Sequence, residues 1–185
     1  MLSRLLITVG FAGFLLAFTG CSVPEPPHLS QTILQLKQGG ELVTVEYRLG
    51  KIIRASDDKT WYKIGNRKIV INCEAYLKAG VNLQNVSTND VYTAEDSIAI
   101  TLPHATVFSL NIPPGEIQVA FEDIGAFRSS FSAAEREQLA AQAEPQFLRL
   151  ADSLGVLKTA EANAALFVEH FFQAAGYAKT SVQFR

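Results

Sequence analysis

Cysteine and histidine are the side chains in this sequence best suited to nucleophilic or metal chemistry. The chain has two cysteines, Cys21 and Cys73, and three histidines, His28, His104 and His170. A nucleophilic cysteine needs a nearby base and a lowered pKa, and no local motif links a histidine to Cys73. Because Cys73 alternates with apolar residues, we expect it to pack in the core as a small hydrophobic side chain.

The histidines do not have the spacing of a metal site. The sequence contains neither HExxH nor CxxC, two common patterns of metal ligands. We expect His28 to be a solvated linker residue. His104 lies between two predicted strands, and His170 follows Glu169 on a predicted helix. Both are expected to be solvated or hydrogen-bonded at the surface, so the sequence predicts neither a metal site nor a cofactor.

Carboxylates gather at two places in the sequence, at Asp57-Asp58 and at Asp90 with Glu95-Asp96. Paired carboxylates can bind calcium or act as acid and base. The spacing of an EF-hand is absent, however, and aspartate is common in turns. We therefore expect these residues to belong to turns.

Motifs for phosphate binding and acyl transfer are also missing. The sequence has no glycine-rich phosphate loop and no GxSxG nucleophile motif. Its one Gly-Gly pair, Gly39-Gly40, directly precedes the first predicted strand. A flexible hinge explains this pair better than a phosphate cradle.

The N-terminus has the features of an export signal. Arg4 is followed by an apolar run from Leu5 to Phe18 that only Thr8 interrupts. This length is typical of the core of a signal peptide, whereas a membrane-spanning helix needs roughly 20 apolar residues. A transmembrane anchor with an incidental cysteine is the less favoured alternative.

The end of this run, Phe18-Thr19-Gly20-Cys21, resembles the lipobox of bacterial lipoproteins, although Phe18 stands where leucine is commonest. The resemblance implies cleavage before Cys21 and attachment of acyl chains such as palmitate to its sulfur and new amino group. Two or more chains hold a protein stably on a bilayer. Ser22 then implies sorting to the outer membrane if the host has two membranes. With Cys21 acylated, Cys73 has no disulfide partner in the chain.

Composition supports one exported domain. We expect a signal peptide at residues 1–20, a lipidated and proline-rich tether at 21–40, and a single domain at 41–185. Loss of Arg4 with the signal would change the formal net charge from −2 to −3. Because phosphate binding needs clustered lysine and arginine, we expect no nucleic-acid partner.

The first part of the domain alternates as strands do. On Lys68–Leu77 one face is apolar and includes Cys73, while the other is polar except for Val70 and Tyr76. Further strands are predicted at 41–49, 60–64, 97–102 and 106–112, with a turn at Ser56–Lys59 and prolines ending the later runs.

The period changes to that of helices after about residue 128. Ser132 and Glu135 have the spacing of a capping box, Pro145 should kink or restart the helix, and Gly155 should end it. A second helix is predicted from a cap at Thr159 up to Gly176. The two expected apolar stripes are Leu139, Ala143, Phe147, Leu150 and Leu154, and Ala160, Ala164, Phe167, Phe171 and Ala175. With a last strand at 180–184, the prediction is an α+β fold: a mainly antiparallel sheet followed by a C-terminal helical hairpin.

Four stretches of the sequence are similar to a bacterial family called domain of unknown function 4230. They are LVTVEY at 42–47, AGVNLQNV at 79–86, ITLPHATVFSLNI at 100–112 and ANAALFVEHFFQAAGY at 162–177. Asn82 stands where the family is expected to have aspartate. The resemblance, which covers about residues 40 to 185, implies no established activity and no catalytic residues.

Two functions are compatible with these features. The favoured one is a lipid-anchored, extracytoplasmic protein of the cell envelope that binds or scaffolds another component, with an envelope protein or a second copy of the chain as partner. The alternative is a hydrolase whose groups meet only in the folded chain. Its first candidates are His104 and the carboxylates from Asp57 to Asp96.

Overall fold

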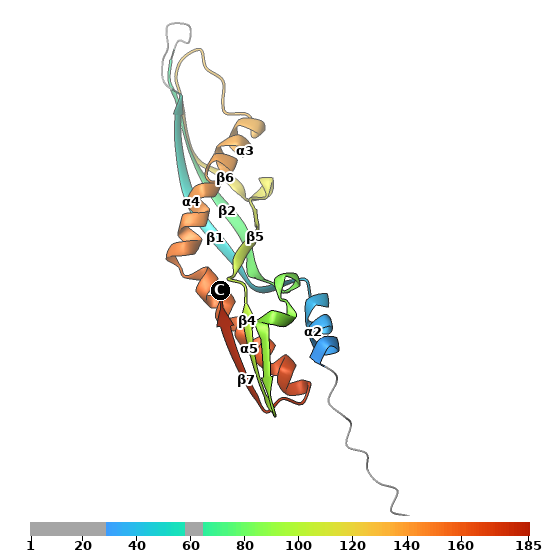
Figure 1. The fold of residues 1–185 in the computed structure, drawn as a ribbon. Coiled ribbons are helices and arrows are strands. Elements are labelled where there is room, and N and C mark those ends of the chain that lie inside the picture. Colours follow the sequence, from blue (N-terminus) through green and yellow to red (C-terminus); the bar gives the residue numbers. More distant parts are fainter. Residues whose placement is uncertain (1–28, 58–64) are drawn as a thin grey trace, which may run out of the picture.

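The computed structural model describes residues 29–57 and 65–185. The predicted signal peptide, Cys21, His28, Asp58 and the predicted strand at 60–64 lie outside the described residues. The molecule is elongated (Figure 1). Its elements in chain order are α2 (Leu29–Gln38), β1 (Glu41–Asp57), β2 (Arg67–Asn82), the short 3-10 helices η1 (Leu83–Asn85) and η2 (Thr88–Asp90), β3 (Val91–Ala94), β4 (Ser97–Leu102), β5 (Thr106–Asn111), η3 (Pro114–Glu116), β6 (Ile117–Ile124), α3 (Ala133–Gln142), α4 (Glu144–Ser153), α5 (Val156–Ala174) and β7 (Lys179–Phe184).

The longest strands of the domain, β1 and β2, pair antiparallel, with Asp57 opposite Arg67. β5 and β6 both pair with β2, each over a different part of its length. Alternate residues of β2 are buried, from Ile69 through Cys73 to Leu77, which confirms the predicted inner face. An irregularity between Val43 and Val45 shifts the register of β1. Val43 is therefore exposed, whereas Val45 is buried.

The second sheet contains β3, β4 and β7. β4 pairs antiparallel with β3 and parallel with β7. The last strand therefore returns to the fold, as predicted from residues 180–184. Because parallel neighbours need a long connection, the chain passes through β5, β6 and all three C-terminal helices between β4 and β7.

The helical region begins and restarts where the sequence indicates. Ser132 caps α3, and Glu135 completes the capping box. Pro145 lies in the first turn of α4, where its missing N–H costs nothing. Gly155 has the left-handed conformation between α4 and α5. α5 begins at Val156, so the predicted cap at Thr159 is wrong.

The buried stripe of α5 differs in phase from the predicted one. Ala160 and Ala164 are buried as expected, but Phe167 is 45% exposed and Val168 takes its place inside. The buried positions of α5 repeat every four residues: Val156, Ala160, Ala164, Val168 and Phe172.

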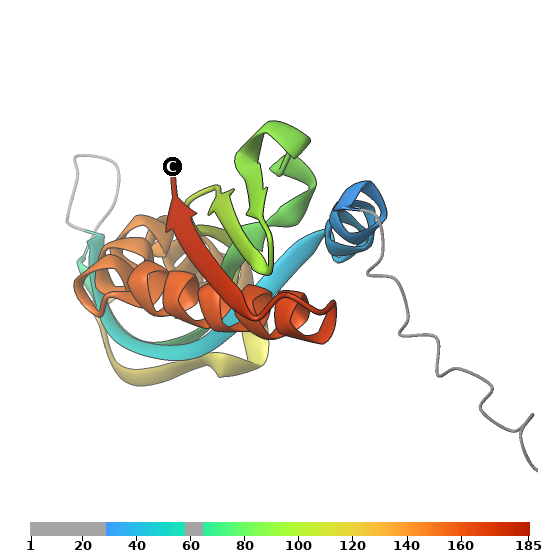
Figure 2. The same ribbon diagram turned by 60° about the horizontal axis from the view of Figure 1, so that its bottom comes forward.

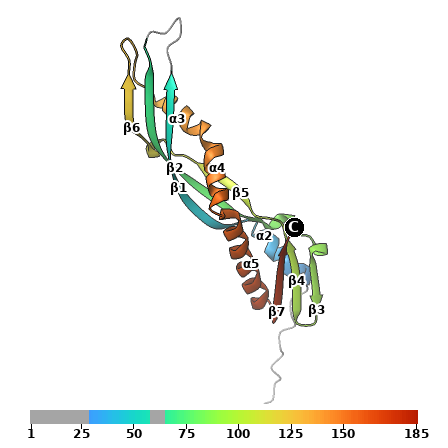
Figure 3. The ribbon, with the colours of Figure 1, turned by 90° about the vertical axis from the view of Figure 1, so that its left-hand side faces the viewer.

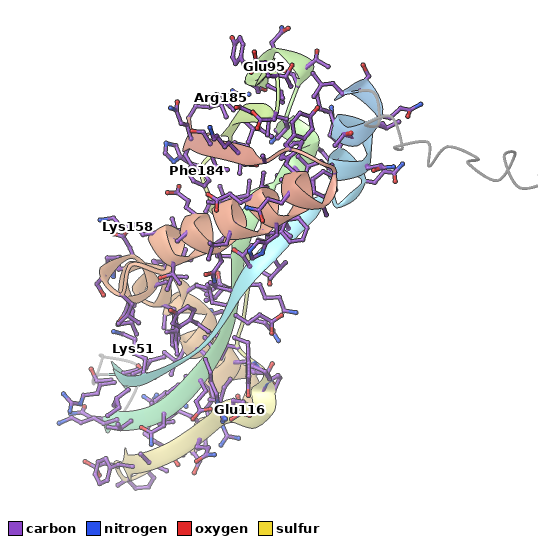
Figure 4. The ribbon with its side chains drawn as sticks, turned by 90° about the horizontal axis from the view of Figure 1, so that it is seen from below. Lys51, Glu95, Glu116, Lys158, Phe184 and Arg185 are labelled. Carbon is purple, nitrogen blue, oxygen red and sulfur yellow. The ribbon has the colours of Figure 1, made fainter. Side chains whose placement is uncertain are left out.

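The α+β class is confirmed: an antiparallel sheet is followed by helices and a final strand. α3, α4 and α5 follow one another along the molecule (Figure 3) instead of folding back as a hairpin. α5 packs against β1 and β2 and also against β7, so it lies between the two sheets (Figure 2). The helices cover one face of the four-stranded sheet (Figure 4). We call the opposite face, which carries Ile52, Arg54 and Tyr76, the outer face.

The predicted tether of residues 21–40 includes α2, which was not expected. α2 buries Thr32, Ile33 and Leu36 and packs on η1. None of the helices in residues 29–57 and 65–185 has the length and apolarity that a membrane span requires.

Gly39 and Gly40 form a bonded turn in place of the predicted hinge. Gly39 N donates to Leu36 O and Gly40 N to Lys37 O, while Leu83 N donates to Gly40 O over 2.9 Å. Gly40 has a φ of 61°, a conformation that glycine adopts without strain.

Candidate functional site

One end of the molecule holds a group of four charged side chains, which we call the distal cluster: Asp57, Arg67, Arg128 and Glu135. β1 ends at Asp57 and β2 begins opposite it at Arg67. Arg67 Nε donates to Asp57 Oδ2 over 3.1 Å, and Arg67 Nη2 donates to Glu135 Oε1 over 2.5 Å. Arg128, in the loop after β6, also donates to Asp57 Oδ2. Asp57 therefore ends a strand and accepts two guanidinium groups, which corrects its expected place in a turn.

The distal cluster is well shielded and electrostatically balanced. The side chains of Arg67 and Arg128 are only 13% and 11% exposed, and the Arg67 guanidinium lies 4.2 Å from the centre of the Phe131 ring. The hydrogen bond from Arg67, followed by those from the Ser132 backbone and hydroxyl, lowers the pKa of Glu135 to about 2. The same hydrogen bond raises the pKa of Arg67. Glu135 and Arg67 are thus held in their charged forms.

This cluster has a structural role because its charges are engaged with each other. It joins the end of β1 and β2 to the loop after β6 and to the first turn of α3. A cavity of about 210 Å³ lies beside it, and its lining includes Ser56, Gln138 and Gln142. Among the described residues, the contacts of the distal cluster place no nucleophile beside a free base of the kind that acid–base catalysis needs.

His104 lies in the other half of the molecule, in the loop between β4 and β5. Its Nδ1 is 2.8 Å from Glu161 Oε1 on α5. The Ala105 N–H donates to the same oxygen over 3.2 Å. The imidazole stacks on Phe184, with 6.3 Å between ring centres, and Phe184 and Arg185 lie at the end of β7 (Figure 4). His104 thus connects the loop to α5 and to the second sheet.

A carboxylate beside a histidine can orient the imidazole for catalysis, but such a site also needs a nucleophile beside the histidine. In the part of the chain that the structure describes, the contacts of His104 and Glu161 include no serine, threonine or cysteine side chain. His104 does not meet the carboxylates that the hydrolase hypothesis joins to it. Asp57 belongs to the distal cluster, at the far end of β1 (Figure 1).

The remaining carboxylates serve local structure. Asp90 accepts hydrogen bonds from the Ser87 backbone and hydroxyl and from Arg185, over 2.9, 2.8 and 3.0 Å. These bonds, those from Ser87 first, lower its pKa. Glu95 and Asp96 form the turn between β3 and β4, as predicted. The backbone oxygen of Asp96 accepts a hydrogen bond from Ala178 N over 2.8 Å, which fixes the start of β7.

Cys73 and His170 match their expected surroundings. Cys73 is 1% exposed, and burial raises the pKa of its thiol, so it is an inert core residue. His170 is exposed on α5. Within residues 29–57 and 65–185, no group of three or more histidine, cysteine, aspartate or glutamate side chains is placed to hold a metal ion.

A shallow hollow of about 300 Å³ lies on the second sheet. Its walls are Tyr92 on β3 and Lys179 on β7, with small residues such as Ala99 and Ser181 between them. The hollow presents an aromatic ring, one amine and several hydroxyls, but no acid–base pair. Sequence reasoning missed it because β3 was not predicted.

The outer face of the first sheet is mostly covered by paired charges. Arg48 pairs with Glu74 and lies 3.6 Å from Glu116. Lys78 pairs with Glu46 over 2.9 Å. Tyr76, one of the two apolar exceptions in the sequence, donates its hydroxyl to Glu116 over 3.2 Å. This part of the outer face is therefore a polar, solvated surface.

Comparison with known proteins gives one result. A family model described as "Protein of unknown function (DUF4230)" matches residues 34–182, which run from α2 into β7. No curated protein and no solved structure matches the chain.

Proposed function

The chain belongs to the family of unknown function DUF4230, whose description names no activity, and we propose from the chain's own features that it is a lipid-anchored envelope protein that binds another envelope component. In this proposal Cys21 carries the acyl chains and the described domain stands outside the cytoplasmic membrane. If the host has two membranes, Ser22 after the acylated position assigns the protein to the outer one.

The anchor would hold the domain close to the bilayer. Leu29, the first residue of α2, follows Cys21 by eight positions. An extended chain spans at most about 3.6 Å per residue, so this segment reaches about 30 Å. α2 lies in the half of the molecule that holds the second sheet, and the distal cluster lies at the opposite end (Figure 3). The distal end would therefore point away from the membrane.

The binding role is supported by the observation that the candidate catalytic groups are engaged in contacts that hold the fold together. The distal cluster, the His104–Glu161 pair and Asp90 all tie elements of the fold together. What remains accessible in the described domain is an elongated, well-packed body with an uncovered sheet face. Such a surface suits recognition of another macromolecule better than it suits chemistry on a small one.

Mass spectrometry of the native protein tests the anchor. We expect a mature chain that begins at Cys21 and carries two or three acyl chains. Cys21→Ala should leave the leader uncleaved. A second variant, in which a signal peptide without a lipidation site replaces residues 1–21, should move from the membrane to the soluble fraction. Finding an unmodified Cys21 thiol in the native protein would refute the anchor.

A further inference from the structure

One part of the outer face differs from the paired charges around it. Ile52 on β1 and Phe121 on β6 are 60% and 57% exposed. Val70 on β2 lies between these strands, directly opposite both Arg54 and Phe121. Residues directly opposite one another in an antiparallel sheet point to the same side, so Ile52, Arg54, Val70 and Phe121 form one continuous area. We call these four residues the outer patch.

Arg54 gives the outer patch a definite electrostatic character. It is exposed on β1, and among the described residues it has no hydrogen bond or ion pair. The other arginine of the outer face, Arg48, is paired with Glu74. Lys68 also has a carboxylate opposite it in the register, that of Asp123. The outer patch therefore combines three apolar side chains with one uncompensated positive charge.

We propose that the outer patch is the docking surface for a protein partner that presents apolar side chains around an aspartate or glutamate. This inference rests on the proposed binding role and names the surface that performs it. An exposed arginine among apolar groups is a common centre of binding energy, because a guanidinium can pair with a carboxylate while its stem packs on apolar atoms. The paired charges nearer α2 would form the polar rim of the contact.

A second copy of the chain fits the outer patch poorly. Two identical patches that meet about a two-fold axis bring two Arg54 side chains into one contact and supply no carboxylate to either, and like charges in such a contact repel. The bilayer that holds the anchor is also an unsuitable occupant. Strands rise about 3.4 Å per residue, so Ile52 lies about 37 Å along β1 from Glu41, toward the distal end.

Site-specific crosslinking of the full chain in its native membrane tests the inference. A photoreactive p-benzoylphenylalanine replaces Phe121, or replaces Leu166 on α5 as the matched control, because Leu166 is 53% exposed on another surface. We expect one protein product from position 121 at a yield at least tenfold above that from position 166. Capture of a product alone does not establish the proposal.

Variants of Arg54 test whether the crosslink depends on its positive charge. Arg54→Glu and Arg54→Gln should each lower the crosslinking yield at least tenfold. Arg149→Glu, an exposed arginine on α4, should leave it unchanged. The carboxylate that faces position 54 in the identified partner is then changed to lysine, which should restore crosslinking to Arg54→Glu. Thermal unfolding of each variant shows that the domain is still folded.

Several results would overturn the inference. The first is an equal crosslinking yield for the wild type and both Arg54 variants. The second is a product that is only a dimer of this chain or a lipid adduct. The third is failure of the reversed charge pair to restore crosslinking. The anchor is judged separately by the mass of Cys21. An acylated protein without the crosslink refutes only the outer patch, and a crosslink from an unmodified protein refutes only the anchor.

Discussion

Arg67 Nη2 lies 2.5 Å from Glu135 Oε1, although the two residues are 68 positions apart in the chain. The contact joins the first residue of β2 to the first turn of α3. The other oxygen of the same carboxylate accepts hydrogen bonds from the Ser132 N–H and hydroxyl, over 2.8 and 3.0 Å. One glutamate thus completes the cap of α3 and fixes that helix to the end of the sheet.

The first prediction concerns acid stability. The pKa of Glu135 is lowered from 4.5 to about 2. Since a lowered pKa stabilises the fold only while the carboxylate is charged, this contribution is complete above about pH 4.5 and is lost as the pH falls toward 2. Glu135→Gln should therefore unfold more easily near neutral pH. Its free energy of unfolding should also depend less on pH between 4.5 and 2 than that of the wild type.

Urea unfolding at several pH values measures this difference. The Glu135 side chain is 37% exposed, so solvent screens part of its interaction, and we expect a loss of about 1 kcal/mol, as for a removed helix cap. Parallel pH profiles for the wild type and Glu135→Gln would contradict the assignment.

The second prediction concerns the geometry of Arg67. Lysine keeps the charge but cannot reach Asp57 and Glu135 with two different nitrogens, and it lacks the planar group that stacks on Phe131. We expect Arg67→Lys to lower the free energy of unfolding by about 2 kcal/mol. Arg48→Lys is the matched control, because Arg48 also pairs with a glutamate and lies over a ring, Tyr76, but on the exposed outer face. The two variants should differ clearly in denaturant midpoint. Similar midpoints would show that the shielding of Arg67 from solvent contributes nothing to stability.

The third prediction concerns the irregular pairing of β1 and β2. A Cβ atom on Gly80 would overlap the carbonyl oxygen of Leu42 and lie 2.8 Å from its carbonyl carbon. Gly80→Ala should force the strands apart and cost about 3 kcal/mol or more. At Gly50, on the same strand pair, a Cβ would meet no atom within 4 Å. Gly50→Ala should therefore raise stability by about 0.5 kcal/mol. Thermal unfolding distinguishes the two, and equal effects would contradict the close approach at Gly80.

Sequence patterns best predicted the elements in which more buried and more exposed residues alternate, such as β2, β4 and β7. β2 is the clearest case, since its period of two is interrupted only by Val70 and Tyr76. β6 was not predicted because most of its residues are exposed, so burial does not impose an alternation of apolar and polar residues on its sequence. α2 was not predicted because only three of its residues are buried and prolines precede it.

The candidate sites depended on pairing that local patterns do not specify. Arg67 meets Asp57 because of the register of β1 and β2, and Arg128 and Glu135 join them only through the path of the chain after β6. The outer patch likewise requires β6 to lie beside β2. Val70 was the signal of this patch in the sequence, as one of two apolar residues on a polar face, but its neighbours were unknown without the sheet order.

The last prediction tests the phase of the buried stripe on α5. That helix has apolar residues on several sides, so its sequence fits two stripes, and the predicted one placed Phe167 inside. In the structure Phe172 is fully buried and packs against the Tyr177 ring edge to face, with 5.9 Å between ring centres. Phe172→Ala should cost about 3 to 5 kcal/mol, through lost burial and the cavity left behind. Phe167→Ala, at a position 45% exposed, should cost about 0.5 kcal/mol or less. Denaturant unfolding of both variants measures the two losses of stability. A larger loss for Phe167→Ala than for Phe172→Ala would support the buried stripe expected from the sequence.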